Sequence, residues 1–250
     1  MIRVSIGVAV TTAALTLVAA CAGGTTPPAA AGATSPENLE RGPVGPDAVF
    51  APGPGAPPTH STELAATRVS RSSVPIPAPD APSRGPANAP VTLQIWSDFE
   101  CPFCAAAAPV VRELETEFGA SLRVVWRSLP LTMHPHAELA AETALEVYAE
   151  RGGAAFWQFH DATFAAAREG LDEKVLARLA ERAGADPQRY RQALATRAHA
   201  AKIQADLAAA DAAGINGAPA FFVNDYYTVG ALPYAELRAI VVQALRDAGH

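Results

Sequence analysis

Apolar side chains follow three different patterns along the chain. Residues 4–20 form one continuous apolar run, residues 22–84 show no hydrophobic periodicity, and the remainder changes between strand-like and helix-like patterns. A segment without periodicity buries too little apolar surface to offset the entropy of ordering it. The pattern therefore predicts one folded region that starts near residue 86, and its length of about 160 residues is enough for a single core.

The folded region begins with the pattern of a strand, a helix and a second strand. Residues 91–96 are β-branched and aromatic with nearly continuous apolar character, which is typical of a buried strand. Apolar residues at helical spacing follow from Val110 to Phe118 and stop at Gly119. Residues 122–126 again have the pattern of a strand. Together these segments predict a β-α-β unit.

A helical block and a second strand pair complete the pattern. Residues 134–213 are alanine-rich with helical spacing, and glycines at positions 152, 153, 170 and 184 interrupt them. Residues 220–223 and 227–229 have the pattern of two strands joined by a turn, and a helix with one apolar face follows from Pro233. A β-α-β unit and a β-β-α unit, separated by a helical insertion, predict an α/β fold with one mixed sheet.

The N-terminal pattern indicates export. A positive start is followed by the apolar run 4–20, which has the length of a signal peptide. The sequence Leu-Val-Ala-Ala-Cys at residues 17–21 resembles the bacterial lipobox, which implies cleavage after residue 20 and acylation of Cys21. Two or three acyl chains would anchor the protein stably to a membrane. The alternative is an ordinary cleaved signal in which Cys21 has no role.

Composition predicts a disordered tether and excludes nucleic acid as a partner. Residues 21–85 are rich in Pro, Ala, Gly and Thr, and we expect them to be a disordered tether with a reach of about 45 Å. The domain organisation is therefore a lipoprotein signal peptide (1–20), the tether (21–85) and a folded domain (86–250). The net charge of −6 provides no basic surface for nucleic acid.

The candidate chemistry lies in two cysteines at the predicted strand-to-helix turn. The chain has three cysteines, and Cys101 and Cys104 form a Cys-Pro-Phe-Cys pair with Pro102 and Phe103. The unpaired N–H groups and the dipole of a helix N-terminus favour the thiolate, so Cys101 is expected to be the exposed, reactive thiol. Cys104, one turn later, is expected to be more buried and to resolve mixed disulfides.

Other interpretations of this pair remain open. Half of a zinc knuckle has the same spacing, but a zinc site needs two further ligands, and no second pair is present. The sequence His134-Pro135-His136 could also bind metal, although such spacing in a loop is usually incidental. The aromatic run 156–160 could line a substrate groove, but core packing of the insertion is the favoured interpretation.

Three motifs in this order resemble the DsbA-like thioredoxin family. They are Ala-Pro-Val-Thr-Leu at residues 89–93, Ser-Asp-Phe-Glu-Cys-Pro-Phe-Cys at 97–104 and Gly-Ala-Pro-Ala-Phe-Phe-Val-Asn at 217–224. The resemblance covers residues 86–250 and includes the helical insertion. It implies a thioredoxin fold and a thiol:disulfide interchange protein.

The resemblance also implies the site. Pro219 is expected to be cis and to face the cysteines, with the backbone of Ala218 offering hydrogen bonds to a bound peptide. Pro102 and Phe103 are expected to support the active site. No cofactor is implied beyond a redox-active Cys101–Cys104 disulfide, and no metal. An ordinary trans proline at position 219 is the alternative.

Two departures from the family pattern affect the expected redox strength. Family members often have a buried glutamate near the end of the first strand, and Ile95 stands at that place. Asp98 or Glu100 could replace it, but each is interpreted as a solvated turn residue. Ala218 stands where a threonine or valine is common.

Three functions follow as hypotheses. The first is a lipid-anchored oxidase of the bacterial envelope that passes disulfides to exported proteins and is reset by a membrane redox partner. The second is a reductase or isomerase of the same fold. The third is a surface-anchored binding module in which the cysteines are only structural. Fold alone does not decide between them.

Overall fold

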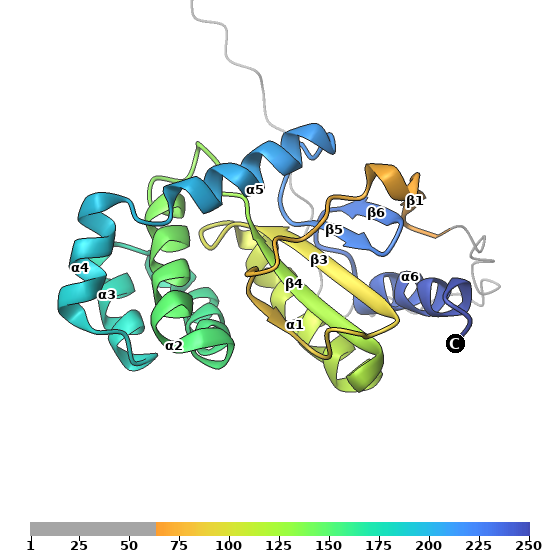
Figure 1. Ribbon diagram of the computed structural model, residues 1–250, viewed down its shortest axis with the longest axis horizontal. Coiled ribbons are helices and arrows are strands. Elements are labelled where there is room, and N and C mark those ends of the chain that lie inside the picture. Colours follow the sequence, from red (N-terminus) through yellow and green to blue (C-terminus); the bar gives the residue numbers. More distant parts are fainter. Residues whose placement is uncertain (1–63) are drawn as a thin grey trace, which may run out of the picture. The chain divides into compact units, whose positions relative to one another are not determined.

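The computed structural model describes residues 64–250, arranged around a six-stranded mixed sheet (Figure 1). The predicted signal peptide, Cys21 and the tether up to residue 63 lie outside the described residues. In spatial order the strands are β1 (Thr67–Arg68), β6 (Tyr226–Val229), β5 (Ala220–Val223), β3 (Val91–Ser97), β4 (Leu122–Ser128) and β2 (Ser83–Arg84). Strands β3 and β4 are parallel, and each of the other neighbouring pairs is antiparallel.

The central strands and α1 (Pro102–Phe118) form the predicted β-α-β unit. The helix ends at Gly119, which has the positive φ of 48° that favours glycine, and the short 3-10 helix η2 (Gly119–Ser121) leads into β4. Strand β3 is buried on both faces, which explains why its sequence is apolar throughout rather than alternating.

Helices cover both faces of the sheet. Helices α1 and α6 (Tyr234–Asp247) lie on one face, and α5 (Ala200–Ala212) crosses the other (Figure 1). The larger core lies under α1 and α6, where Leu93 and Ile95 of β3 point. Trp96 points to the opposite face and packs with the residues near α5. Alternate residues of one strand therefore serve two cores.

The helical insertion lies at one end of the sheet, on the left in Figure 1. It contains α2 (Ala137–Ala166), η3 (Ala167–Glu169), α3 (Glu173–Arg182), α4 (Pro187–Thr196) and α5. Helix α2 is interrupted at Gly152, whose φ of 77° is non-helical, as its glycine pair predicted. Asp172 and Asp186 cap α3 and α4 through their side chains. Between residues 64 and 250 no helix is both long and apolar enough to cross a membrane.

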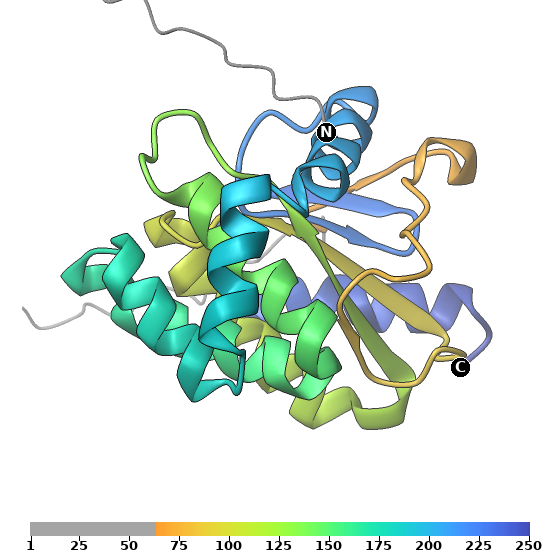
Figure 2. The same ribbon diagram turned by 60° about the vertical axis from the view of Figure 1, so that its left-hand side comes forward.

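The prediction of a disordered tether is wrong for residues 64–85. This segment, the N-terminal arm, contains β1, η1 (Arg71–Ser73) and β2, and it runs from one edge of the sheet to the other (orange in Figures 1 and 2). Strand β1 pairs with β6, and β2 pairs with β4. The arm is ordered by backbone pairing with exposed edge strands, which a search for apolar periodicity does not detect.

Side chains attach the arm to the helices. Arg84 pairs with Glu115 of α1 at 2.6 Å, and its guanidinium lies 4.1 Å from the ring centroid of Trp157 in α2. Gly85, with a φ of 84°, lies against β4 so closely that a Cβ atom would be 2.2 Å from the carbonyl oxygen of Leu122. The folded region therefore begins before residue 86.

Candidate functional site

The two cysteines lie at the start of α1, directly after β3 ends. Cys101 is the N-cap residue with an extended backbone, and Pro102 occupies the first helical position, where its missing N–H is not needed. Both thiols are free and buried, with 3% of Cys101 and none of Cys104 exposed. Cys101 is thus less exposed than expected, whereas Phe103 between the two is 63% exposed.

The predicted cis peptide bond precedes Pro219 and faces this pair. The Ala218–Pro219 bond is cis, and the Cys101 thiol donates to the carbonyl oxygen of Ala218 at 3.5 Å. The loop before β5 therefore places a backbone acceptor beside the sulfur of Cys101, 117 residues away in sequence.

The two thiols have opposite acidities. A hydrogen bond from Cys104 and backbone N–H groups of Cys104 and Phe103 lower the pKa of Cys101 to about 6, although burial and the charge of Asp98 oppose the shift. Burial, together with its hydrogen bond to Cys101, raises the pKa of Cys104. At neutral pH the pair therefore holds a thiolate at Cys101 and a protonated thiol at Cys104.

The interpretation of Asp98 as a solvated turn residue is wrong. Its side chain has no exposed surface, and its carboxylate accepts the backbone N–H groups of Glu100 and Leu131, each at 2.8 Å. Its Oδ2 atom also lies 2.7 Å from Nδ1 of His134. Ile95, which stands at the position of the family's glutamate, is 4% exposed and belongs to the larger core.

The two histidines of the loop after β4 bind two different carboxylates. His134 contacts Asp98, and Nδ1 of His136 lies 3.1 Å from Oε1 of Glu100, whose side chain is 14% exposed. Within residues 64–250 no group of three or more His, Cys, Asp or Glu side chains could hold a metal ion. Each of the two histidines therefore has a carboxylate partner of its own.

An aromatic cluster lies beneath the cysteine loop. Phe99 stacks on Trp126 with a centroid distance of 4.7 Å and contacts the ring of His160 at 5.9 Å. Burial, with a smaller effect of Arg84 and Arg112, lowers the pKa of His160 to about 3. The favoured interpretation of the aromatic run as core packing is consistent with the burial of Phe156, Trp157, Phe159 and His160.

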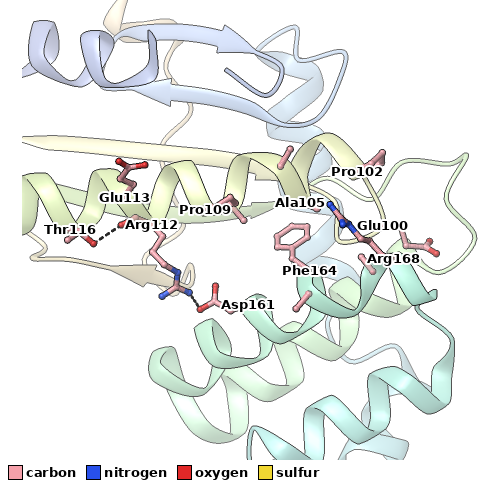
Figure 3. A pocket seen from close by; sticks show the side chains of 14 residues that line it. Glu100, Pro102, Ala105, Pro109, Arg112, Glu113, Thr116, Asp161, Phe164 and Arg168 are labelled. Atoms are coloured by element: carbon pink, nitrogen blue, oxygen red, sulfur yellow. Dashed lines mark hydrogen bonds and ion pairs between the residues drawn. The ribbon is translucent and has the colours of Figure 1, made fainter. Parts of the chain in front are cut away.

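A groove of about 890 Å³ runs beside the site, between α1 and the end of α2 (Figure 3). It begins at Glu100 and Pro102, and Ala105 and Pro109 of α1 lie opposite Phe164 of α2. The ion pair between Arg112 and Asp161 spans the groove farther along α1. The groove is long enough to follow α1 for several turns away from the cysteines, and the sequence alone gave no signal for it.

The chain is similar to one protein family and to several solved structures. A sequence model of the family described as "Thioredoxin" matches residues 78–243. The oxidised BdbD of Bacillus subtilis superposes with a TM-score of 0.60 at 21% identity, over 67% of this chain and 94% of that one. A thioredoxin-like oxidoreductase of Silicibacter pomeroyi superposes with a TM-score of 0.58 at 26% identity, over 68% and 94%.

A curated relative carries a different name. The chain is 45% identical over 172 residues to the Na(+)/H(+) antiporter NhaA 3 of Salinispora tropica, which covers 66% of this chain but 26% of the relative. The chain spans about a quarter of the length of the curated relatives it matches. The name antiporter therefore belongs to proteins about four times the length of the shared segment.

Proposed function

Because the chain belongs to the thioredoxin family, with the helical insertion of its DsbA-like members, we propose that it exchanges disulfides with exported proteins through Cys101 and Cys104. The observation that carries the proposal is the asymmetry of the pair, with the pKa of Cys101 lowered to about 6 and that of Cys104 raised. The Cys101 sulfur is thereby suited to act as nucleophile and as leaving group, and the Cys104 sulfur stays protonated until it resolves a mixed disulfide.

The exchange proceeds in two displacements. A substrate thiolate attacks Sγ of Cys101 in the enzyme disulfide, and Cys104 leaves and takes up a proton because burial disfavours its thiolate. A second substrate thiolate then attacks the substrate sulfur of the mixed disulfide, and Cys101 leaves as a thiolate. The substrate gains a disulfide and loses two electrons, which the enzyme holds as a dithiol.

The residues around the pair suggest how substrate is held. The Ala218 carbonyl oxygen beside Cys101 can accept an N–H of an extended peptide, as in strand addition to an exposed backbone edge. Phe103, exposed beside the pair, and the groove that starts at Pro102 offer apolar contacts to the flanking chain.

We propose that the protein acts as an oxidase rather than a reductase. A low thiolate pKa stabilises the dithiol form, and a disulfide whose reduced form is stabilised is the stronger oxidant. The pKa of Cys101 is lowered from that of an ordinary thiol, which is the direction that stabilises the dithiol form. The reductase or isomerase alternative predicts a lower reduction potential and a donor that keeps the pair reduced.

The proposed location is the bacterial envelope, with a lipid on Cys21 holding the protein at a membrane. A membrane redox partner would then accept the two electrons and restore the disulfide. We do not propose ion exchange for this chain, because the segment that it shares with the antiporter relatives is about a quarter of their length.

The reduction potential of the pair tests this proposal. The protein is equilibrated with glutathione buffers of defined ratio, thiols are trapped with acid and alkylated, and the oxidised fraction is read by mass spectrometry. We expect a value toward the oxidising end of the range of about −270 to −120 mV, and rapid oxidation of a reduced model protein. A value near −270 mV would favour the reductase, and a pair that does not titrate would support a structural role in a binding module.

A further inference from the structure

Asp98 is the most highly connected polar side chain beside the cysteines. Its carboxylate is fully buried and accepts the N–H groups of Glu100 and Leu131. His134 approaches the same Oδ2 atom that Leu131 uses, at 2.7 Å. The carboxylate therefore joins the turn before α1 to the loop after β4, which follow different strands.

The backbone of the same residue contacts both cysteines. The N–H of Asp98 donates to Sγ of Cys104 at 3.4 Å, and its carbonyl oxygen accepts the N–H of Cys101 at 3.2 Å. The carboxylate contacts and these backbone contacts therefore belong to the same turn, which links Asp98 to both cysteines.

The charge of Asp98 requires a partner because a buried carboxylate without one is costly. Its neighbour His134, with a side chain 19% exposed, carries the balancing charge when it is protonated. Partial burial disfavours its charged form, but its hydrogen bond to the Asp98 carboxylate and the charges of Asp98, Cys101 and Glu100 prevail and raise the pKa of His134. The remaining ionisable groups at this place are Cys104 and His136, which is bound to Glu100.

We infer that Asp98 and His134 form a positioning pair for the redox-active cysteines, in which the carboxylate fixes the turn that contacts the Cys104 sulfur and the Cys101 backbone, and the imidazole balances its charge. The inference rests on the proposed function for its consequence in exchange. Neither residue needs to touch substrate, since the carboxylate acts through the backbone and the imidazole acts through the carboxylate.

The charge balance between Asp98 and His134 predicts a pattern of Cys101 reactivity in single and double variants that a merely structural contact does not. Replacing His134 with a neutral side chain leaves the Asp98 charge unbalanced beside Cys101, which disfavours the thiolate. Removing both charges together abolishes that repulsion, so the double variant should recover what the single variant loses. A purely structural contact predicts no recovery, because the double variant lacks both native side chains.

The test measures the pH profile of Cys101 alkylation by iodoacetamide in the reduced full chain. Compared are the native protein, His134→Asn, Asp98→Asn/His134→Asn and the matched control His136→Asn. Asn at 134 can still donate to Asp98, and the double variant can form an amide–amide hydrogen bond. We expect His134→Asn to slow alkylation at pH 6 by roughly three- to tenfold, as for loss of a nearby opposite charge. The double variant should return at least halfway, and His136→Asn should change little.

Two results would overturn the inference: His134→Asn slowing alkylation no more than His136→Asn does, or the double variant reacting as slowly as the single one. Thermal unfolding is recorded for each variant, and His134→Gln answers the same question should His134→Asn fail to fold. Alkylation does not require exchange activity. If the native protein exchanges no disulfides, the proposed function fails while the profiles still decide whether the pair exists.

Discussion

At the scale of single residues, the site depends on two neighbouring thiols that the fold makes chemically different. Cys101 lies at a helix N-terminus and faces the Ala218 carbonyl, whereas Cys104 is enclosed by the core one turn later. The same functional group therefore has two roles because only one of the two sulfurs can carry charge at neutral pH.

This difference predicts selective alkylation. In the reduced protein, Cys101 should react with a midpoint near pH 6, and at pH 7 its thiolate fraction should be about thirtyfold that of an ordinary thiol of pKa about 8.5, while Cys104 stays unmodified. Peptide mapping by mass spectrometry distinguishes the two positions. In urea both cysteines should react alike, and native Cys104 reacting first would contradict the assignment.

His160, in the core beneath the site, should make the stability of the protein depend on pH. His160 is buried among aromatic rings with a pKa near 3, below the unfolded value of about 6.5. The unfolded chain therefore binds an extra proton between these values, and stability is lost as pH falls from 6.5. We expect His160 to contribute a slope of about 1 kcal/mol per pH unit in this window.

Urea unfolding at pH 7.0, 6.0 and 5.5 measures this slope, and His160→Phe should flatten it. His134 acts with the opposite sign, because its raised pKa adds stability that is present at low pH and lost as pH rises. Comparing the native protein with the His160 variant cancels that contribution. Equal slopes in the two proteins would show that His160 is protonated in the folded state.

At the scale of elements, a buried ion pair joins β4 to α5. Arg127 and Asp206 lie 2.5 Å apart with side chains 4% and 10% exposed, and Asp206 also accepts the N–H of Ser128 at 2.8 Å. The guanidinium lies 4.7 Å from the ring centroid of Trp96. This pair holds α5 across the sheet face that α1 and α6 leave uncovered.

Breaking that pair should be strongly destabilising. Asp206→Ala leaves a guanidinium buried without its partner, and we expect a loss of about 3–5 kcal/mol in the free energy of unfolding. Glu117→Ala is the matched control, because it breaks an exposed pair with Arg238 and should cost less than about 1 kcal/mol. Similar losses in the two variants would contradict the burial argument.

The elements differ in how far the sequence predicts them. Strand β3 and the end of α1 at Gly119 were predictable because continuous apolar character and a terminal glycine are local signals. The cis bond at Pro219 followed from a motif. Strands β1 and β2 were missed because each has two residues and owes its order to partners elsewhere in the chain.

The site shows the same division. The cysteine pair and its place at a helix start can be predicted from the sequence, but the burial of Asp98 cannot. Its carboxylate is covered by a loop whose Leu131 lies 33 residues later. A polar residue before a helix is usually solvated, and only the fold shows that this one is enclosed.

At the scale of the whole molecule, the N-terminal arm should matter for stability. A chain that starts at residue 86 lacks β1, β2 and the contacts of Arg84 with Glu115 and Trp157, whereas a chain that starts at residue 64 retains them. We expect the shorter chain to melt at least about 5 °C lower, as a loss of a few kcal/mol implies. Circular dichroism of both chains measures this, and equal melting temperatures would show that the arm contributes no stability.

The course of the arm also affects how readily other polypeptides could pair with the edges of the sheet. A catalyst that handles reduced, unfolded polypeptides works among chains that readily add to any free strand edge and start aggregates. Here one segment covers both edges of the sheet, leaving two-residue strands at the rim. For the proposed exchange with unfolded substrates, the two edges of the sheet therefore offer little unpaired backbone for unwanted strand addition.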